Sequence, residues 1–386
     1  MRLFHKVQNT LGIVLIAFCI LLLATCAAGQ SPKFNQPGNT LIADQFNNRV
    51  IEVDPEGKIV WQFGKGPADF SRASIIGTND AQRVGVFTLM AGTGIPAGQP
   101  EAPNCTNGNG CLDNRVILVN PAGHIVWQYG EFGVAGSGPN QLNTPVQNTW
   151  LPNKHVLITD QANERIIEVT HDKKIVWQYG TTGVSGLGPN LLNNPNCAEL
   201  LENGHILICD ENNNQALEVT HTTPSSIVHS YTIAGGMLFS GVAFASRLPN
   251  GHTLITDSNN ARIVETDEAG NAFFQYFTNT DAASNSRCLP PPTGCTGPLP
   301  TRAIRLHNGN TLISDQYNHR VIEVDSNGAI AHSFGEIATL GYNTKSVASG
   351  GLNSPYDAKH IGDYTGITPP FGFDRDGDGD GDQDRN

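Results

Sequence analysis

The chain has 386 residues, a formal net charge of −12 and a charged fraction of 15%. Proteins that bind nucleic acid need a basic footprint that neutralises phosphates, so this charge balance excludes nucleic acid as a partner. Gly, Asn and Thr supply much of the polarity, which is typical of an all-β protein with many turns.

The N-terminus has the pattern of an export signal. A short basic start precedes an apolar run without charge at 11–25, and small residues follow at 27–29. This run is too short and too poorly flanked for a membrane span, so we expect residues 1–29 to be a signal peptide and the mature protein to be extracytoplasmic. The residues ending at Cys26 also resemble a bacterial lipobox, in which Cys26 would carry a lipid anchor to a membrane. Both ordinary cleavage and lipidation are compatible with the sequence.

One motif recurs along the chain. Copies begin at Asn39, His155, His205, His252 and Asn310, and a degenerate copy ends at Gly123. Each copy divides into short strands rich in β-branched residues and separated by Asn-Gly or Asp-containing turns, the pattern of a β-meander. In the copy that ends at Gly180, we expect strands at 146–151, 155–159, 165–170 and 174–179. No stretch has a helical period.

The repeats predict a closed ring. An aromatic residue or histidine marks the fourth strand of each unit, at Trp61, Trp127, Trp177, His229, Phe274 and His332. The first unit lacks its own first strand, whereas residues 352–361 match the segment that forms this strand elsewhere. We therefore predict an all-β, six-bladed β-propeller of four-stranded antiparallel blades over residues 36–361, in which 355–361 supply the inner strand of the first blade. Such closure removes open sheet edges.

The repeated pattern Asn/Gly-x-Thr-Leu-Ile-x-Asp-x-x-Asn-x-Arg-Val-x-Glu-Val-Asp-x-x-Gly resembles that of NHL-repeat propellers. The added segment Ile-Val-Trp-Gln-Tyr-Gly, at 125–130 and 175–180, is similar to the arylsulfotransferase-like and quinoprotein-like propellers. The resemblance covers residues 38–361 and implies the architecture. It implies no single activity, because such repeats serve enzymes, binding proteins and scaffolds alike.

Six cysteines of the expected mature chain form three close pairs in the sequence. The pairs are Cys105 with Cys111, Cys197 with Cys209, and Cys288 with Cys295. An even count in an exported protein indicates disulfides. For the second pair, two small buried residues on neighbouring strands are the alternative. The spacing does not favour a metal site, because the chain has no Cys-x-x-Cys pair.

The most repeated polar residues are expected to be structural. Asp315 ends a second strand, Asn318 follows three residues later and Arg320 opens the third strand, and other copies repeat this order. Asp and Asn satisfy turn amides at such places, and the arginine is positioned to bind the carboxylate. A role repeated in every blade belongs to the frame, whereas an active site breaks pseudo-symmetry.

The long loops are expected to share one face. In a four-stranded meander, the turns after second strands and the links between blades lie on the same side. We name this side the loop-rich face; its long segments are 94–112, 131–144, 181–194, 277–299 and 336–354. Functional sites sit on loops that a rigid frame holds, so we expect a binding or interaction module that uses this face for a protein, glycan or small-molecule partner.

The channel mouth is the second candidate site. Alignment of the first strands predicts that Arg72, Gln147, Phe244, Arg302 and Asp357 line it as ligand-binding residues. Arg72 and Arg302 would hold an anionic group opposite Asp357, or an internal Arg–Asp network would plug the channel. The alternative function is an enzyme of arylsulfotransferase-like or lyase-like type acting here, but no nucleophilic histidine can be placed beside the arginines. The sequence leaves open whether the protein is catalytic.

Residues 371–386 form an Asp/Gly-rich acidic tail. Asp376, Asp378 and Asp380 stand at alternate positions, as in the first half of a calcium-binding loop. The bidentate glutamate expected later in such a loop is absent. Weak Ca²⁺ binding and a plain acidic tail are both compatible with this composition.

Overall fold

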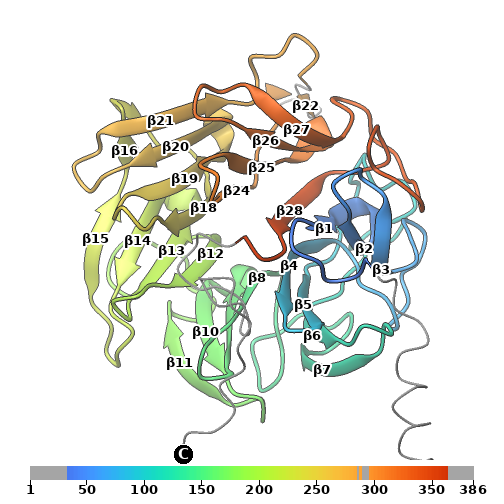
Figure 1. The fold of residues 1–386 in the computed structure, drawn as a ribbon. Coiled ribbons are helices and arrows are strands. Elements are labelled where there is room, and N and C mark those ends of the chain that lie inside the picture. Colours follow the sequence, from blue (N-terminus) through green and yellow to red (C-terminus); the bar gives the residue numbers. More distant parts are fainter. Residues whose placement is uncertain (1–32, 285–286, 289–294, 364–386) are drawn as a thin grey trace, which may run out of the picture. The chain divides into compact units, whose positions relative to one another are not determined.

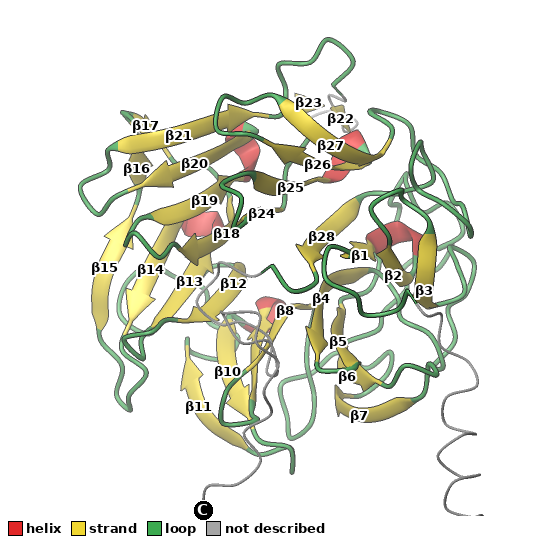
Figure 2. Cartoon of the chain, viewed as in Figure 1, coloured by secondary structure: helices red, strands yellow, loops and turns green. Residues whose placement is uncertain are grey.

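The computed structural model describes residues 33–284, 287–288 and 295–363. By its contacts the chain divides into the units Met1–Phe34 and Asn35–Asn386, and every described strand belongs to the second. Among the described residues, no helix is long and apolar enough to cross a membrane. Figures 1 and 2 show the second unit as blades of β-strands around a common centre, with helix confined to short turns.

Six four-stranded antiparallel sheets form the blades. The first contains β28 (Pro355–His360), β1 (Thr40–Asp44), β2 (Arg49–Val53) and β3 (Ile59–Phe63). The second contains β4 (Thr78–Val84), β5 (Phe87–Gly92), β6 (Arg115–Val119) and β7 (Ile125–Gly130). The third contains β8 (Pro145–Trp150), β9 (Val156–Asp160), β10 (Arg165–Val169) and β11 (Ile175–Tyr179).

The other blades follow the same order, from the inner strand outwards. The fourth contains β12 (Pro195–Leu200), β13 (Ile206–Asp210), β14 (Gln215–Val219) and β15 (Ile227–Tyr231). The fifth contains β18 (Val242–Arg247), β19 (Thr253–Asp257), β20 (Arg262–Thr266) and β21 (Ala272–Phe277). The sixth contains β24 (Arg302–Arg305), β25 (Thr311–Asp315), β26 (Arg320–Val324) and β27 (Ile330–Gly335). The hairpins β16–β17 (Ile233–Ala234, Met237–Leu238) and β22–β23 (Arg287–Cys288, Cys295–Thr296) lie in links between blades.

The predicted closure is confirmed. Strand β28 pairs antiparallel with β1, with His360 opposite Thr40 and Asp357 opposite Ala43. The inner strands contact one another in the order β28, β4, β8, β12, β18, β24 and back to β28. The chain therefore forms an all-β, six-bladed propeller, and the segment near the end of the chain completes the first blade.

The core lies between the blades. Second and third strands such as β1, β2, β9 and β10 are buried along their whole length, because each blade packs between two others. This explains why these strands read as nearly continuous apolar runs rather than as an alternation of apolar and polar residues. One buried cluster joins Leu89 and Val116 of the second blade to Val156 and Ile158 of the third.

The repeated Asp, Asn and Arg residues hold the turn after each second strand. In the sixth blade, the Asp315 carboxylate accepts hydrogen bonds from Asn318 Nδ2 and Arg320 Nε, each at 2.8 Å. Burial raises the pKa of Asp315 to about 6, and Arg320 and Asn318 offset only part of this effect. The contacts confirm that this recurring arginine binds the carboxylate.

The turns after the second strands are hydrogen-bonded to the links between blades. These turns and links therefore lie on the same face of the propeller. The recurring asparagine of each turn donates to a link carbonyl, from Asn47 to Gly341, Asn163 to Gly136, Asn213 to Gly186, Asn260 to Leu238 and Asn318 to Thr278. The donor–acceptor distances lie between 2.7 and 3.2 Å. The loop-rich face is therefore fastened to the frame in five of the six blades.

Candidate functional site

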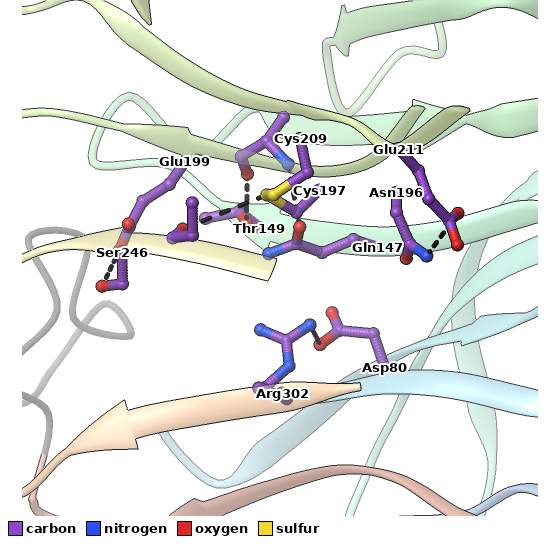
Figure 3. Close-up of a disulfide and its surroundings, with 12 residues drawn as sticks. Asp80, Gln147, Thr149, Asn196, Cys197, Glu199, Cys209, Glu211, Ser246 and Arg302 are labelled. Carbon is purple, nitrogen blue, oxygen red and sulfur yellow. Dashed lines mark hydrogen bonds and ion pairs between the residues drawn. A yellow bond between two sulfur atoms is a disulfide. The ribbon is translucent and has the colours of Figure 1, made fainter. Parts of the chain in front are cut away.

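Four buried charged groups from three consecutive inner strands, β24, β28 and β4, form a cluster in the channel. Arg302 Nη2 lies 2.9 Å from Asp80 Oδ1, and Arg302 Nε lies 2.6 Å from Asp357 Oδ1. Lys359 Nζ donates to Asp80 Oδ1 at 2.7 Å and to the Ala81 carbonyl at 2.8 Å, and it also contacts Asp357 Oδ2. Figure 3 shows Arg302 of β24 and Asp80 of β4 pointing toward each other. Two cations and two carboxylates thus neutralise one another.

The pKa values of the two carboxyl groups reflect this balance. Burial alone would raise the pKa of Asp80, but Lys359 and Arg302 outweigh it and hold the pKa below its ordinary value. Burial raises the pKa of Asp357, since Arg302 and Lys359 offset only part of it and Asp80 adds a like charge. The cluster is therefore a shared ion network inside the channel.

The structure brings four of the five predicted channel residues together. Gln147, Phe244 and Arg302 line one cavity, Asp357 pairs with Arg302, and the Arg302 guanidinium lies 4.1 Å from the centre of the Phe244 ring. The cavity measures about 50 Å³. All six inner strands contribute to its wall, through Gln82, Thr149, Glu199, Ser246, Ile304 and Lys359.

The predicted channel position of Arg72 is wrong. Asp80 occupies the equivalent place, since it pairs with Ala91 as Asp357 pairs with Ala43. The alignment matched Ala73 to Ala303, but Ala81 holds that position because the link before β4 contains extra residues that no repeat marks. Arg72 lies in this link with an exposed side chain.

Sequence reasoning also missed two members of the ion network, Asp80 and Lys359. Lys359 stands two residues after Asp357 in the closing strand, so strand alternation was a usable signal. Asp80 had no such signal, because its blade is the degenerate copy of the repeat.

A hydrogen-bonded chain crosses the channel near the loop-rich face. The Tyr356 hydroxyl, from the first blade, and the Asn196 side-chain amide of the fourth blade are joined at 2.9 and 3.1 Å. Asn196 Nδ2 also donates to Glu211 Oε2 at 2.9 Å, as Figure 3 shows, and Asn194 Nδ2 donates to the same oxygen at 3.0 Å. Burial raises the pKa of Glu211 to about 7, because these amides stabilise the ionised form only in part.

Both described disulfides match predicted pairs. Cys197 and Cys209 join β12 to β13 within the fourth blade, beside Gln147 in Figure 3. Cys105 and Cys111 close a loop on the loop-rich face. For the third pair, β22 and β23 place Cys288 opposite Cys295, but their side chains lie outside the described residues. Cys26 and the candidate calcium ligands Asp376, Asp378 and Asp380 also lie outside them.

The Cys105–Cys111 loop forms one wall of a recess on the loop-rich face. The recess measures about 350 Å³. Its lining residues are Phe70, Ile76, Asn107, Asn109, Gly110, Cys111, Leu112, Phe132 and Gly133. None of them is titratable apart from the disulfide-bonded cysteine. The floor rests on a buried apolar cluster in which Phe46 of the first blade and Tyr317 of the sixth pack with Ile95 and Cys105.

The insertion that builds this recess also repairs the frame of the second blade. Gly92 stands where other blades have the recurring Asp, because it pairs with Arg115 as Asp44 pairs with Arg49. Asp113, at the end of the insertion, fills the space, and a Cβ on Gly92 would lie 2.5 Å from its carboxylate. Asp113 Oδ1 accepts from Arg115 Nε at 2.5 Å. The recess is therefore fixed to the propeller at a buried ion pair.

The disulfide loop itself has a defined backbone. Ile95 and Cys111 exchange backbone hydrogen bonds of 2.8 and 2.9 Å, and Asn353 Nδ2 donates to the Glu101 carbonyl at 2.7 Å. Gly110 has a φ of +81°, and a Cβ there would lie 2.4 Å from the Ile95 carbonyl oxygen. Only glycine fits this turn without displacing the backbone.

Two arginines flank the aromatic wall of the recess. The Arg115 guanidinium lies 4.6 Å from the centre of the Phe132 ring, and the Arg72 guanidinium lies 5.8 Å from it. Arg115 is fully buried, whereas Arg72 is exposed. Both separations fall within the range of cation–π contacts.

The described residues contain no group of three or more His, Cys, Asp or Glu side chains arranged to hold a metal ion. The recurring histidines instead bind glutamates of their own blades: His205 Nδ1 lies 2.7 Å from Glu218, and His252 Nδ1 lies 2.8 Å from Glu265. His155 contacts Glu168 in the same way, at 2.5 Å. These histidines belong to the frame.

No family model matches the chain, and no curated protein matches it. Among solved structures, a protein of unknown function from Bacteroides caccae is 14% identical, and the match covers 79% of this chain and 98% of that one with a TM-score of 0.51. A putative 6-phosphogluconolactonase from Bacteroides uniformis is 12% identical, with 84% and 99% covered and a TM-score of 0.47. Virginiamycin B lyase from Staphylococcus aureus is 14% identical, with 68% and 70% covered and a TM-score of 0.42.

These identities show the fold alone. The chain is a six-bladed β-propeller with lyase-like and lactonase-like neighbours at low identity. The specific assignment to NHL repeats is not confirmed, and the neighbours' activities are not transferred to this chain.

Proposed function

We propose that this protein is an exported binding module that holds a small polar ligand in the recess beside the Cys105–Cys111 disulfide. The observation that carries the proposal is the lining of that recess. Phe70 and Phe132 offer aromatic surface, and Asn107 and Asn109 add side-chain amides at the rim. Apolar walls with a few placed polar groups are what small-ligand sites have in common.

Size separates the recess from the channel. The recess, at about 350 Å³, falls within the roughly 300–1,000 Å³ of ligand sites. The channel cavity, at about 50 Å³, has room only for a few water molecules, since one water needs roughly 10–15 Å³. A saccharide ring or a molecule of similar size therefore fits the recess and does not fit the channel cavity.

The charges in the channel also favour the recess over the channel cavity as the ligand site. The four charged groups in the channel neutralise one another through contacts within the chain. A reaction there would have to break a buried ion network, and leaving one buried charge without its partner costs about 3–5 kcal/mol. We therefore do not propose catalysis at the channel.

The ligand class that fits the recess best is a saccharide. Sugar rings present an apolar face that packs on aromatic side chains and hydroxyl groups that pair with amide side chains. Two disulfides are consistent with the oxidising, extracytoplasmic setting in which saccharides are met.

The test is saccharide binding by the mature protein, measured by calorimetry against a panel of neutral and acidic oligosaccharides. Binding is expected, and Phe132→Ala should weaken it by about tenfold or more, because truncating an aromatic anchor removes most of its contact with the ligand. The matched control is Phe273→Ala, since Phe273 is 57% exposed on β21 of the fifth blade. Absence of saccharide binding, or equal losses in both variants, would overturn the proposal.

A further inference from the structure

Arg72 is fixed at the edge of the recess by its backbone. It stands between the lining residues Phe70 and Ile76, and its carbonyl oxygen accepts a hydrogen bond from Arg115 Nη1 at 3.0 Å. Its guanidinium lies 5.8 Å from the ring centre of Phe132. The position of the Arg72 side chain is thus set on one side by the frame and on the other by the aromatic wall.

The two arginines around Phe132 differ in how their charge is compensated. Arg115 is buried and binds Asp113 and the Ser74 carbonyl, with distances of 2.5 and 2.9 Å from Nε and Nη2. Arg72 is exposed, and no carboxylate of the described residues pairs with it. Arg115 is therefore part of the frame, whereas the charge of Arg72 faces solvent at a ligand-sized recess.

The exposed Arg72 guanidinium favours ligands that carry a negative charge. The chain carries a net charge of −12, and the lining of the recess itself is uncharged. A cation at the rim of an uncharged recess favours an anionic ligand there, against the net negative charge of the chain. The planar guanidinium matches the geometry of a carboxylate or a sulfate through two parallel hydrogen bonds.

We propose that the recess takes an acidic saccharide, whose carboxylate or sulfate group binds Arg72 while its ring packs against Phe132. The inference rests on the proposed function and specifies its ligand class. The shared chemistry is a sugar ring that bears one anionic group within reach of the guanidinium. Uronic acids and sulfate esters are the two sources of that group.

The experiment compares matched oligosaccharides that differ only in charge. A neutral oligosaccharide, its uronate counterpart and its sulfated counterpart are titrated into the mature protein by calorimetry, at low and at physiological salt. The acidic forms should bind about tenfold more tightly than the neutral form, and salt should narrow the difference. The tighter of the two acidic ligands identifies the source of the anion.

Substitution of Arg72 separates charge from shape. Arg72→Gln should abolish the preference for acidic ligands, measured as the ratio of the affinities for the acidic and neutral forms, and Arg72→Lys should retain only part of that ratio. The side chain is exposed, so melting temperatures of both variants should match that of the original protein. Arg247→Gln is not a suitable control, because Arg247 pairs with Glu218 between blades. Lys345→Gln, at an exposed position of another link, serves instead.

Two outcomes distinguish this inference from the proposed function. Equal binding of neutral and acidic forms, unaffected by Arg72→Gln, would overturn the role of Arg72 and leave the saccharide site standing. Absence of binding by every oligosaccharide, or binding that Phe132→Ala leaves intact, would overturn the saccharide site itself.

Discussion

The channel and the recess use arginine in opposite ways. In the channel, Arg302 lies between Asp80 and Asp357, and Lys359 completes a neutral network contributed by the inner strands of three blades. At the recess, the Arg72 guanidinium lies over the Phe132 ring and pairs with no carboxylate of the described residues. The Arg302 charge is compensated by buried carboxylates and stabilises the propeller. The Arg72 charge is exposed and is available to a ligand.

The regions also differ in their relation to the repeat. The channel is built from inner strands that every blade possesses, whereas the recess is built from an insertion that only the second blade carries. The insertion keeps the frame intact, because Asp113 replaces the missing recurring carboxylate and binds Arg115. A pseudo-symmetric frame can therefore gain a local site without losing a buried ion pair.

The largest expected effect tests the channel. Arg302→Met removes one cation and leaves two buried carboxylates with Lys359 alone, so the free energy of unfolding should fall by about 3–5 kcal/mol. Denaturant unfolding of the mature protein measures this loss. Saccharide affinity should remain within twofold once the protein is folded. A loss below about 1 kcal/mol would show that the network contributes little to the frame.

The two disulfides provide a direct comparison of the regions. Replacing Cys197 and Cys209 by serine should lower the free energy of unfolding by about 3 kcal/mol, and replacing Cys105 and Cys111 should lower it by about 2 kcal/mol, because the first pair closes the longer loop. Saccharide affinity should instead be more sensitive to the loss of the Cys105–Cys111 disulfide than to the loss of Cys197–Cys209. The second double variant should lose saccharide binding, since Cys111 lines the recess, and the first should keep it.

Calorimetric titration at a temperature where both double variants are folded measures that contrast. Loss of binding in both would mean that affinity follows overall stability. Retention in both would mean that the recess does not depend on the Cys105–Cys111 loop for its shape.

The smallest expected effect is the dependence of stability on pH that Glu211 causes. Burial raises the pKa of Glu211 to about 7 from an ordinary value of 4.5, so ionisation between these values is easier in the unfolded chain. The stability contribution of Glu211 is therefore highest below pH 4.5 and falls as pH rises through 7. Glu211→Gln should remove this penalty and increase stability at pH 8 by on the order of 2 kcal/mol, with little gain at pH 4.5.

Urea unfolding at pH 4.5, 6 and 8 gives the difference in free energy of unfolding between the original protein and the Gln variant at each pH. A gain that does not grow with pH would contradict the raised pKa of Glu211. Glutamine has nearly the same shape as glutamate and keeps one carbonyl oxygen that can accept from Asn196 and Asn194. The packing therefore changes little in this variant.

The fold followed from the sequence because blade architecture is a local property repeated many times. Each copy contains its own turns and strand lengths, and the match between 352–361 and an earlier first strand sufficed to predict closure. The equivalence of Gln147, Phe244, Arg302 and Asp357 followed from the constant spacing to the recurring Asp. The same method misplaced Arg72, because the second blade lacks that Asp and the link before β4 has no repeat to count from.

What the sequence determined by itself was therefore the frame: the number of blades, the closing strand and the face that carries the long loops, with candidate disulfide pairs among its close cysteines. Only the tertiary structure showed the recess that we propose as the site. Packing brought Phe70, Phe132 and the Cys105–Cys111 loop around one recess and left Arg72 exposed beside it. These contacts join separate loops, and no local spacing specifies them, because the distance between two loops is set by the blades beneath them.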